Sequence, residues 1–447
     1  MLVILNNNLI FLFSILNNNC IFAVVFKQIK DMNEEIIKRL IIEKQAEIVS
    51  TELIRRPVDL EYAANYVFVG LRRAGKSYQM YQHIQDLVSS KQISIEEVLY
   101  VNFEDERIAS IKAEGLGLLL DAYKEMFDFK PLVFLDEIQN ITGWEKFARR
   151  LADAKYKVFI TGSNAQMLSK EIYTTLGGRF IAREIFPFSF QEYLTYHEIV
   201  LNKNWEYTDI RTQVIRLFRN YFYYGGFTES FAINDKRSWL NSLYQKILLG
   251  DIISRNDIRN ENAIRVLVKK LAESVMQPSS LSRIKNIVDS TGTTISRNTL
   301  TDYLQFLTDA YLVFGISNFS DKLSDKETFK KRYFFDNGLL NNFLFDPETK
   351  LLENMVAIDL KKKYGENLFF YNKNVEVDFF IPKERRAIQV SYNITNDITR
   401  QREITALLKL SEVYRLDKLE IVTFDEESTL QANGATIQVI PIWKWLL

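Results

Sequence analysis

The chain is poor in the residues that build disulfides and zinc clusters. Among its 447 residues there is one cysteine, Cys20, and there are two histidines, His83 and His197. One cysteine cannot form an internal disulfide, and these three residues cannot supply the four ligands of a structural zinc site. Lysine plus arginine and aspartate plus glutamate each total 57, so no charge of one sign dominates. Any basic surface that binds nucleic acid must therefore be local. The single cysteine leads us to expect a reducing, cytoplasmic location.

A long apolar run is also missing. In residues 1–31, two asparagine triplets interrupt the apolar segments 9–16 and 21–26. A membrane helix needs ~20 mostly apolar residues, and a signal peptide needs a basic start and a small-residue cleavage site. Met32 instead opens an ordinary amphipathic stretch. We expect residues 1–31 to be non-structural or to precede the true start, with a membrane anchor as the alternative, and we expect no membrane association.

From Met32 onward, short β-rich runs alternate with helical patterns, which predicts an α/β fold with a doubly wound parallel sheet. The apolar runs are too short for helices and do not alternate with polar residues, as expected for strands covered on both faces. The predicted strands are 66–69, 98–103, 132–135, 158–161 and 179–184. This organisation ends near Pro187, so the core domain is predicted to cover residues 32–190.

A phosphate-binding loop follows the first predicted strand, in the segment Gly70-Leu-Arg-Arg-Ala-Gly75-Lys76-Ser77. The glycines let backbone N–H groups surround a polyphosphate, Lys76 reaches its β and γ phosphates, and Ser77 ligates Mg²⁺. A glycine-rich turn without a ligand is the alternative, but the strand-loop-helix setting favours ATP with Mg²⁺. The predicted nucleotide-binding residues are Gly70, Arg73, Ala74, Gly75, Lys76, Ser77 and Tyr78.

A second nucleotide motif is predicted where the apolar run Leu132-Val-Phe-Leu ends in two acids, Asp136 and Glu137. At the carboxyl end of a strand, Asp136 can hold the water shell of Mg²⁺, and Glu137 can polarise the water that attacks the γ phosphate. A solvated strand end is the ordinary alternative for such a pair. The phosphate loop earlier in the chain favours the functional interpretation.

Polar residues after two further strands are candidates for sensing the γ phosphate. Ser163 and Asn164 follow the strand at 158–161, although ordinary turn chemistry explains them equally well. Arg179 follows two glycines and could neutralise charge on the γ phosphate, with a surface arginine as the alternative and Arg72 or Arg73 as substitutes.

Together these segments resemble a prokaryotic AAA-type ATPase family with a carboxy-terminal domain of unknown function. The resemblance rests on 70–77, Leu135-Asp136-Glu137-Ile-Gln, Ile160-Thr-Gly-Ser-Asn, Leu176-Gly-Gly-Arg179 and Phe186-Pro-Phe-Ser-Phe-Gln-Glu-Tyr. It implies a P-loop NTPase sheet of the additional-strand class, in which a sensor strand lies between the two motif-bearing strands. It covers the chain from about residue 60 to the end.

The next two regions are predicted to be helical. Residues 191–250 carry aromatic stripes at helical spacing and are assigned to a helical lid subdomain. In residues 251–335, helices at 280–289 and 296–310 followed by an apolar strand predict a winged helix. Its second helix carries Arg297 against Asp302 and Asp309, which is less basic than most DNA-reading helices. DNA contact and protein docking therefore both stay open.

The last region, residues 336–447, looks like the restriction-endonuclease fold, with Glu353, Asp378 and Gln389 at positions that gather around magnesium in active relatives. The lysine position two residues past Gln389 reads Ser391. A serine cannot supply the cation or the base that phosphodiester hydrolysis needs. We therefore expect a vestigial site without nuclease activity, although a lysine from elsewhere, such as Lys383, could substitute.

The expected function is that of a Mg²⁺-dependent ATPase in which Lys76 and Glu137, with Arg179 and Asn164, act on the γ phosphate. Its nucleotide cycle would drive or gate the C-terminal module against a protein or DNA partner. The alternative is a signalling or defence switch that binds ATP and turns it over only when a partner binds. An active nuclease is the least favoured function. The sequence leaves the partner and the oligomeric state open.

Overall fold

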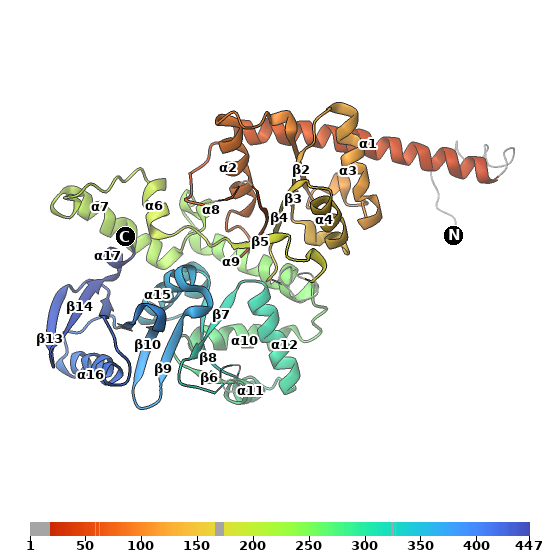
Figure 1. Cartoon of the computed structure of the whole chain (residues 1–447). Helices are drawn as coiled ribbons and strands as arrows, with labels where there is room; N and C mark the ends of the chain where they lie inside the picture. The colour runs from red at the N-terminus through yellow and green to blue at the C-terminus, as the bar shows by residue number, and fades with distance from the viewer. Residues whose placement is uncertain (1–17, 59, 62, 166–173, 323–325, 327) are drawn as a thin grey trace. The chain divides into compact units, whose positions relative to one another are not determined.

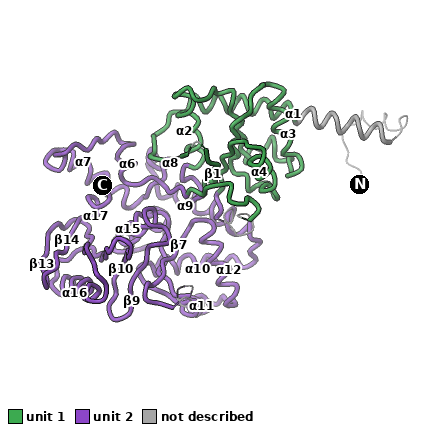
Figure 2. Tube along the Cα trace, viewed as in Figure 1, with its two compact units in different colours: residues 1–68, 76–162, 167–183 green, residues 69–75, 163–166, 184–447 purple. Residues whose placement is uncertain are grey.

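The computed structural model describes the chain except for residues 1–17, 59, 62, 166–173, 323–325 and 327 (Figure 1). The described residues form two compact units (Figure 2). The first unit comprises residues 1–68, 76–162 and 167–183, and the second comprises residues 69–75, 163–166 and 184–447. The phosphate loop thus belongs to the second unit up to Gly75, and to the first unit from Lys76 onward.

The first unit is built on a five-stranded sheet with the order β2-β3-β4-β1-β5. Its strands are β1 Asn65–Val69, β2 Val98–Asn102, β3 Leu132–Asp136, β4 Lys157–Gly162 and β5 Phe180–Glu184. β3 pairs in parallel with β2 on one side and with β4 on the other. The five predicted strands are confirmed, and so is the sensor strand β4 between the motif-bearing strands β3 and β1.

Helices connect the strands of this sheet and pack against its faces. The helices are α1 Asn18–Ser50, α2 Lys76–Ser89, α3 Gly117–Met126 and α4 Trp144–Asp153, with single turns η1 Ile95–Glu97, η2 Glu106–Ile108, η3 Ala113–Leu116 and η4 Ile138–Asn140. On α1, Ile41 and Ile48 are fully buried, and the Gln45 amide donates to the carbonyl of Val98 over 2.8 Å. α1 therefore packs on β2 as part of the core.

The predicted segment 1–31 lies partly outside the described residues. α1 begins at Asn18 and runs without interruption through Met32. The predicted boundary between the non-structural segment 1–31 and the core domain therefore falls inside one helix. Among the described residues, no helix combines the length and the apolar character needed to cross a lipid bilayer.

The second unit begins with helices. They are α6 Phe190–Tyr196, η6 Trp205–Tyr207, α7 Asp209–Tyr224, α8 Thr228–Phe231, α9 Lys236–Lys246, the π-helix η7 Ile247–Ser254, α10 Glu261–Glu273, α11 Leu281–Ser290 and α12 Arg297–Asp309. The aromatic stripe of α7 is buried through Phe218 and Phe222, as predicted for a core-facing stripe. The serines Ser280 and Ser296 cap α11 and α12, because each side chain accepts a hydrogen bond from a backbone N–H of the first helical turn.

A nine-stranded sheet of order β13-β14-β12-β11-β10-β9-β7-β8-β6 runs through the rest of this unit. Its strands are β6 Ser279–Ser280, β7 Val313–Asn318, β8 Phe329–Phe334, β9 Phe369–Asn372, β10 Glu376–Ile381, β11 Arg386–Val390, β12 Lys418–Thr423, β13 Ser428–Ala432 and β14 Ala435–Pro441. The helices among them are α14 Asn337–Asn341, α15 Glu348–Tyr364, η8 Gly365–Asn367, η9 Pro382–Glu384, α16 Asp397–Val413 and α17 Ile442–Trp445. Since β7 pairs in parallel with β9, one sheet spans the predicted boundary between residues 335 and 336.

A buried carboxylate connects the end of β8 to the glycine turn after α7. Asp336 is 3% exposed, and it accepts hydrogen bonds from the backbone N–H groups of Gly226, over 2.8 Å, and Leu339, over 3.1 Å. A Cβ on Gly225 would lie 2.1 Å from Asp336 Oδ2, so only glycine allows this approach. Burial raises the pKa of Asp336 to about 6, while the backbone donors act in the opposite direction.

We predict that Asp336→Asn lowers the free energy of unfolding by about 1–3 kcal/mol, because an amide leaves one buried N–H without an acceptor. The pKa of Asp336 is raised on folding to about 6, so its contribution to stability is lost as pH rises through that value. The variant should lack this dependence. Urea unfolding below and above this pH measures both effects. The control is Asp346→Asn at an exposed position, and equal unfolding midpoints for the two variants would contradict the prediction.

Candidate functional site

The phosphate loop has the backbone conformation that its glycines allow. Between the end of β1 and the start of α2, Gly70 has φ 145° and Gly75 has φ 96°, and Arg73 is also left-handed with φ 63°. A Cβ on Gly70 would lie 2.2 Å from the carbonyl oxygen of Ile185. Side chains at both glycine positions are therefore excluded, and the loop leads directly into the N-terminal end of α2, which favours an anion.

Two arginines of the loop are engaged by acids of the second unit. The Arg72 guanidinium makes a two-point contact with Asp251, with Nε 2.7 Å from Oδ2 and an Nη 3.2 Å from Oδ1. Asp251 is 4% exposed and lies in the π-helix η7, a type of element that is frequent at functional sites. Arg73 forms an ion pair with Glu229 at the start of α8. Neither acid was predicted.

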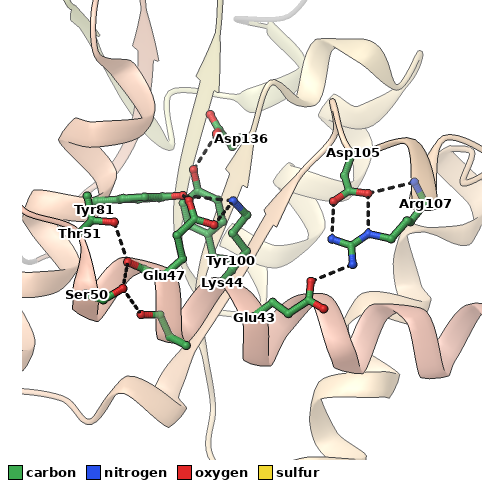
Figure 3. A network of polar contacts seen from close by, with 11 residues as sticks. Glu43, Lys44, Glu47, Ser50, Thr51, Tyr81, Tyr100, Asp105, Arg107 and Asp136 are labelled. Atoms are coloured by element: carbon green, nitrogen blue, oxygen red, sulfur yellow. Dashed lines mark hydrogen bonds and ion pairs between the residues drawn. The ribbon is translucent and has the colours of Figure 1, made fainter. Parts of the chain in front are cut away.

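Asp136 is the centre of the polar cluster in the first unit. It ends β3 and is 2% exposed. Its Oδ1 accepts hydrogen bonds from the hydroxyls of Ser77, over 3.0 Å, and Thr161. Its Oδ2 accepts one from the hydroxyl of Tyr100 over 2.6 Å (Figure 3). Three elements, α2, β4 and β2, thus direct a neutral donor at one buried carboxylate.

The electrostatics of Asp136 reflect this burial. Burial and the nearby charge of Glu137 raise its pKa, while the hydroxyls of Thr161, Tyr100 and Ser77 lower it. Burial, followed by the charge of Asp136, raises the pKa of Tyr100 well above its usual value, so the phenol stays a donor. The cluster therefore holds a carboxylate that would gain much from a cation.

Glu137 follows in a strained backbone conformation, with φ 52° and ψ 39°. Its backbone N–H donates to the Thr161 hydroxyl over 2.9 Å, and its Oε1 lies 3.7 Å from Nζ of Lys76, whose side chain is 3% exposed. The Gln139 amide donates to its other oxygen. The lysine of the loop and the predicted base therefore meet in one place, as the two motifs require.

The residues present fit a magnesium ion. Ser77 and Asp136 supply a hydroxyl and a carboxylate oxygen 3.0 Å apart, and both are hard oxygen ligands of the kind that Mg²⁺ prefers. In the described part of the chain, no group of three or more His, Cys, Asp or Glu side chains could hold a metal. A magnesium ion bound with a nucleotide typically keeps several waters and uses one or two protein oxygens together with phosphate oxygens.

The other residues predicted to act on or bind the nucleotide lie at the end of β4, on the first turn of α2 and next to α4. Asn164 and Ser163 directly follow β4 and are 6% and 1% exposed, so the sensor role of Asn164 stays a prediction. Tyr78 is 57% exposed on the first turn of α2. The Arg179 guanidinium contacts Asp153 at the end of α4, with 2.5 Å between Nε and Oδ1. Its described contacts do not include the Asp136 cluster, and its catalytic role stays a prediction.

The three predicted nuclease-like residues do come together in the second unit. Glu353 on α15 and Asp378 on β10 both contact the same ammonium, and Gln389 on β11 accepts a hydrogen bond from the backbone N–H of Asp378 over 2.8 Å. They line a cavity of about 880 Å³ together with Glu376, Glu403 and residues of α15 and α16.

A lysine from elsewhere in the chain does lie in this cluster, although it is not Lys383. Ser391 donates its hydroxyl to the carbonyl of Asn393 and supplies no charge, as expected, and Lys383 is exposed on η9. The ammonium comes instead from Lys331 on β8, with Nζ 2.9 Å from Asp378 Oδ1. Lys331 belongs to a different predicted module, so its place beside Asp378 depends on the sheet that joins the two.

Four residues that contact the predicted site residues were not predicted: Tyr100, Thr161, Asp251 and Lys331. Thr161 could have been found, because it ends the strand next to Asp136 in the predicted sheet. Tyr100 is an apolar-looking strand residue whose hydroxyl becomes informative only when the neighbouring strand is known. For Asp251 and Lys331, no local pattern indicates a partner.

Comparisons with known proteins agree with this geometry. Residues 63–194 match a family described as an AAA domain, and residues 215–350 match a domain of unknown function, DUF8612. The uncharacterized protein MJ1544 of Methanocaldococcus jannaschii is 34% identical over 432 residues, which cover 93% of this chain and 94% of that protein. An uncharacterized protein of Haemophilus influenzae is 28% identical over 393 residues, 85% of this chain and 94% of that protein.

Solved structures resemble the chain more distantly. The Walker-type ATPase PABY2304 of Pyrococcus abyssi is 16% identical, with a TM-score of 0.37, and the match covers 69% of this chain and 95% of that chain. The Aeropyrum pernix Orc1 protein in complex with DNA is also 16% identical, with a TM-score of 0.27 and coverage of 72% and 93%. Scores this low do not establish a shared arrangement of the whole chain. On the sequence comparisons and the five-stranded sheet, the chain belongs to the family of MJ1544 and carries an AAA-type P-loop ATPase domain.

Proposed function

We propose that this protein is a Mg²⁺-dependent ATP hydrolase whose nucleotide cycle drives or gates a C-terminal interaction module. The observation that carries the proposal is the meeting of Lys76, Glu137, Ser77 and Asp136 in one unit, at the start of α2 and the end of β3. Each side chain comes from a motif that sequence analysis identified independently. Chance strand-end acids would not be expected to reach the lysine and the serine of the loop.

Each residue has a separate chemical task. Lys76 binds the terminal phosphates, and Ser77 with Asp136 holds the magnesium, which neutralises phosphate charge when bound. Glu137 accepts a proton from the attacking water. Its carboxylate lies 3.7 Å from Nζ of Lys76, so the proposed base and the phosphate-binding cation belong to the same site.

The position of the phosphate loop supports coupling to the C-terminal module. Residues 69–75 pack within the second unit, where Arg72 pairs with the buried Asp251 of η7. The following residue, Lys76, begins α2 in the first unit. A nucleotide that reorganises the loop therefore acts on groups held by the second unit, which is a physical route from the phosphates to that unit.

The finer assignments of the second unit belong to this proposal. The order α10-α11-α12-β7-β8 supports a winged-helix-like module in residues 251–335, and the order α15-β9-β10-β11-α16-β12 supports a restriction-endonuclease-like domain in residues 336–447. A protein or a DNA partner fits such modules. The proposed function does not include cleavage of nucleic acid. It does include a cytoplasmic location.

One observation favours the alternative of a switch with negligible basal turnover. Both oxygens of Glu137 are engaged by protein groups, one near Lys76 and the other by the Gln139 amide. The base must be released from these groups before it can orient water. Turnover that is low alone and rises when a partner from the native cytosol is added would identify the switch.

We predict that Lys76→Ala abolishes binding of ATP, because the ammonium is the cation nearest the predicted γ phosphate. Calorimetric titration with ATP and Mg²⁺ measures the affinity. Lys124→Ala is the control, since it removes the same charge from an exposed position on α3 of the same unit. Unchanged affinity in the Lys76 variant would rule out the phosphate-loop function.

We predict that Tyr100→Phe raises the Mg²⁺ concentration for half-maximal ATP binding by about tenfold, since loss of a hydrogen bond that orients a metal-ligating carboxylate typically lowers metal affinity by about 10–100-fold. Binding without Mg²⁺ should not change. Tyr81→Phe is the matched control, because its hydroxyl donates to Glu47 on α1 and not to Asp136 (Figure 3). An equal shift in both variants would show that Tyr100 has no specific effect on the magnesium carboxylate.

We predict that Glu137→Gln keeps ATP binding and lowers turnover by at least about two powers of ten, because an amide can orient water but cannot take its proton. Single-turnover phosphate release measures the loss. A smaller loss would place the base elsewhere. Because this variant should accumulate the ATP-bound state, recovery of bound proteins and nucleic acid from native cytosol would also identify the partner.

A further inference from the structure

Lys331 lies at the centre of a second buried charge cluster, which the nucleotide chemistry does not use. Its side chain on β8 is 0% exposed. The ammonium lies 2.9 Å from Asp378 Oδ1, 3.0 Å from Glu376 Oε1 and 3.4 Å from Glu353 Oε1. Three N–H donors thus meet three carboxylates, which come from α15 and β10.

The charge state of the cluster follows from its burial and from these contacts. Burial alone would lower the pKa of Lys331, but Asp378, Glu353 and Glu376 raise it above its usual value, so the ammonium is permanent. Burial and the charge of Asp378 raise the pKa of Glu353 to about 7. One cation is therefore shared among acids that would repel one another without it.

Two neutral donors add hydrogen bonds to the cluster. Asp378 Oδ2 accepts a hydrogen bond from the backbone N–H of Val390 over 2.9 Å, and Glu353 Oε1 accepts one from the Tyr333 hydroxyl over 2.7 Å. In contrast to Asp136, whose partners are neutral hydroxyls, Asp378 has a full positive charge beside it.

We infer that the Lys331 ammonium occupies the place of a divalent cation in this cluster, and that the wild-type cluster binds no such ion. Between Glu353 Oε1 and Asp378 Oδ1, where Lys331 Nζ lies, a metal could bind only by displacing a side chain that has no exposed surface. If both stayed, two cations would lie within a few ångströms of each other in a poorly solvated site. The inference attributes the expected lack of nuclease activity to a resident cation rather than to a missing lysine.

The test asks whether removing the ammonium creates a metal site. In the full-length chain, Lys331→Gln should gain one bound Mn²⁺ relative to wild type, counted by electron paramagnetic resonance, and Mn²⁺ should raise its melting temperature. Adding Asp378→Asn to this variant should abolish both gains. Lys350→Gln is the matched control, because it removes the same charge from a residue that lines the same cavity, and it should gain no ion.

A folded Lys331→Gln variant that binds no additional Mn²⁺ would overturn the inference. A second comparison does not depend on the folding of that variant. Wild type and Glu376→Gln should bind equal numbers of Mn²⁺ ions, because the Glu376 side chain is 46% exposed and its loss is tolerable. Fewer ions in Glu376→Gln would show that the wild-type cluster holds a metal, and would overturn the inference without affecting the proposed ATPase activity.

Discussion

The structure of the first unit is constrained by the hydrogen bonds that one buried carboxylate, Asp136, must accept. Asp136 is removed from water at the end of a central strand, and an ionised carboxylate in such a place is costly unless it is hydrogen-bonded. The hydroxyls of Ser77 on α2, Thr161 on β4 and Tyr100 on β2 donate the hydrogen bonds that stabilise it. The register of β2 and β4 against β3, and the start of α2, are therefore coupled to the state of a single side chain.

Much of the first unit could be predicted from the sequence because its signals are local. A phosphate loop needs two glycines, a lysine and a serine in fixed order, and the φ angles of 145° at Gly70 and 96° at Gly75 show why the order matters. The five strands were found because parallel strands buried on both faces read as short apolar runs. Asp136 and Glu137 were placed correctly because the end of a strand is visible in the sequence.

The rest could not be predicted, because it depends on contacts between elements far apart in the chain. Lys331 reaches Asp378 only because β7 pairs in parallel with β9, which joins two predicted modules into one sheet. Nothing in the neighbourhood of Lys331 indicates that pairing. Asp251 is similar, since its partner Arg72 lies 179 positions earlier in the chain. Ser391 supplies no charge, as predicted, but the substitute lysine is Lys331 rather than the nearby Lys383.

The two buried acid clusters stabilise a carboxylate away from water with different kinds of donor. Around Asp136 the donors are neutral hydroxyls, so the carboxylate is stabilised while its charge stays uncompensated, and a magnesium ion still gains by approaching it. Around Asp378 the donor is an ammonium, so the charge is compensated within the protein. The type of donor, rather than the number of acids, therefore decides which cluster can exchange a cation with solvent. Of these two clusters, the one around Asp136 is therefore the one that we expect to bind a magnesium nucleotide.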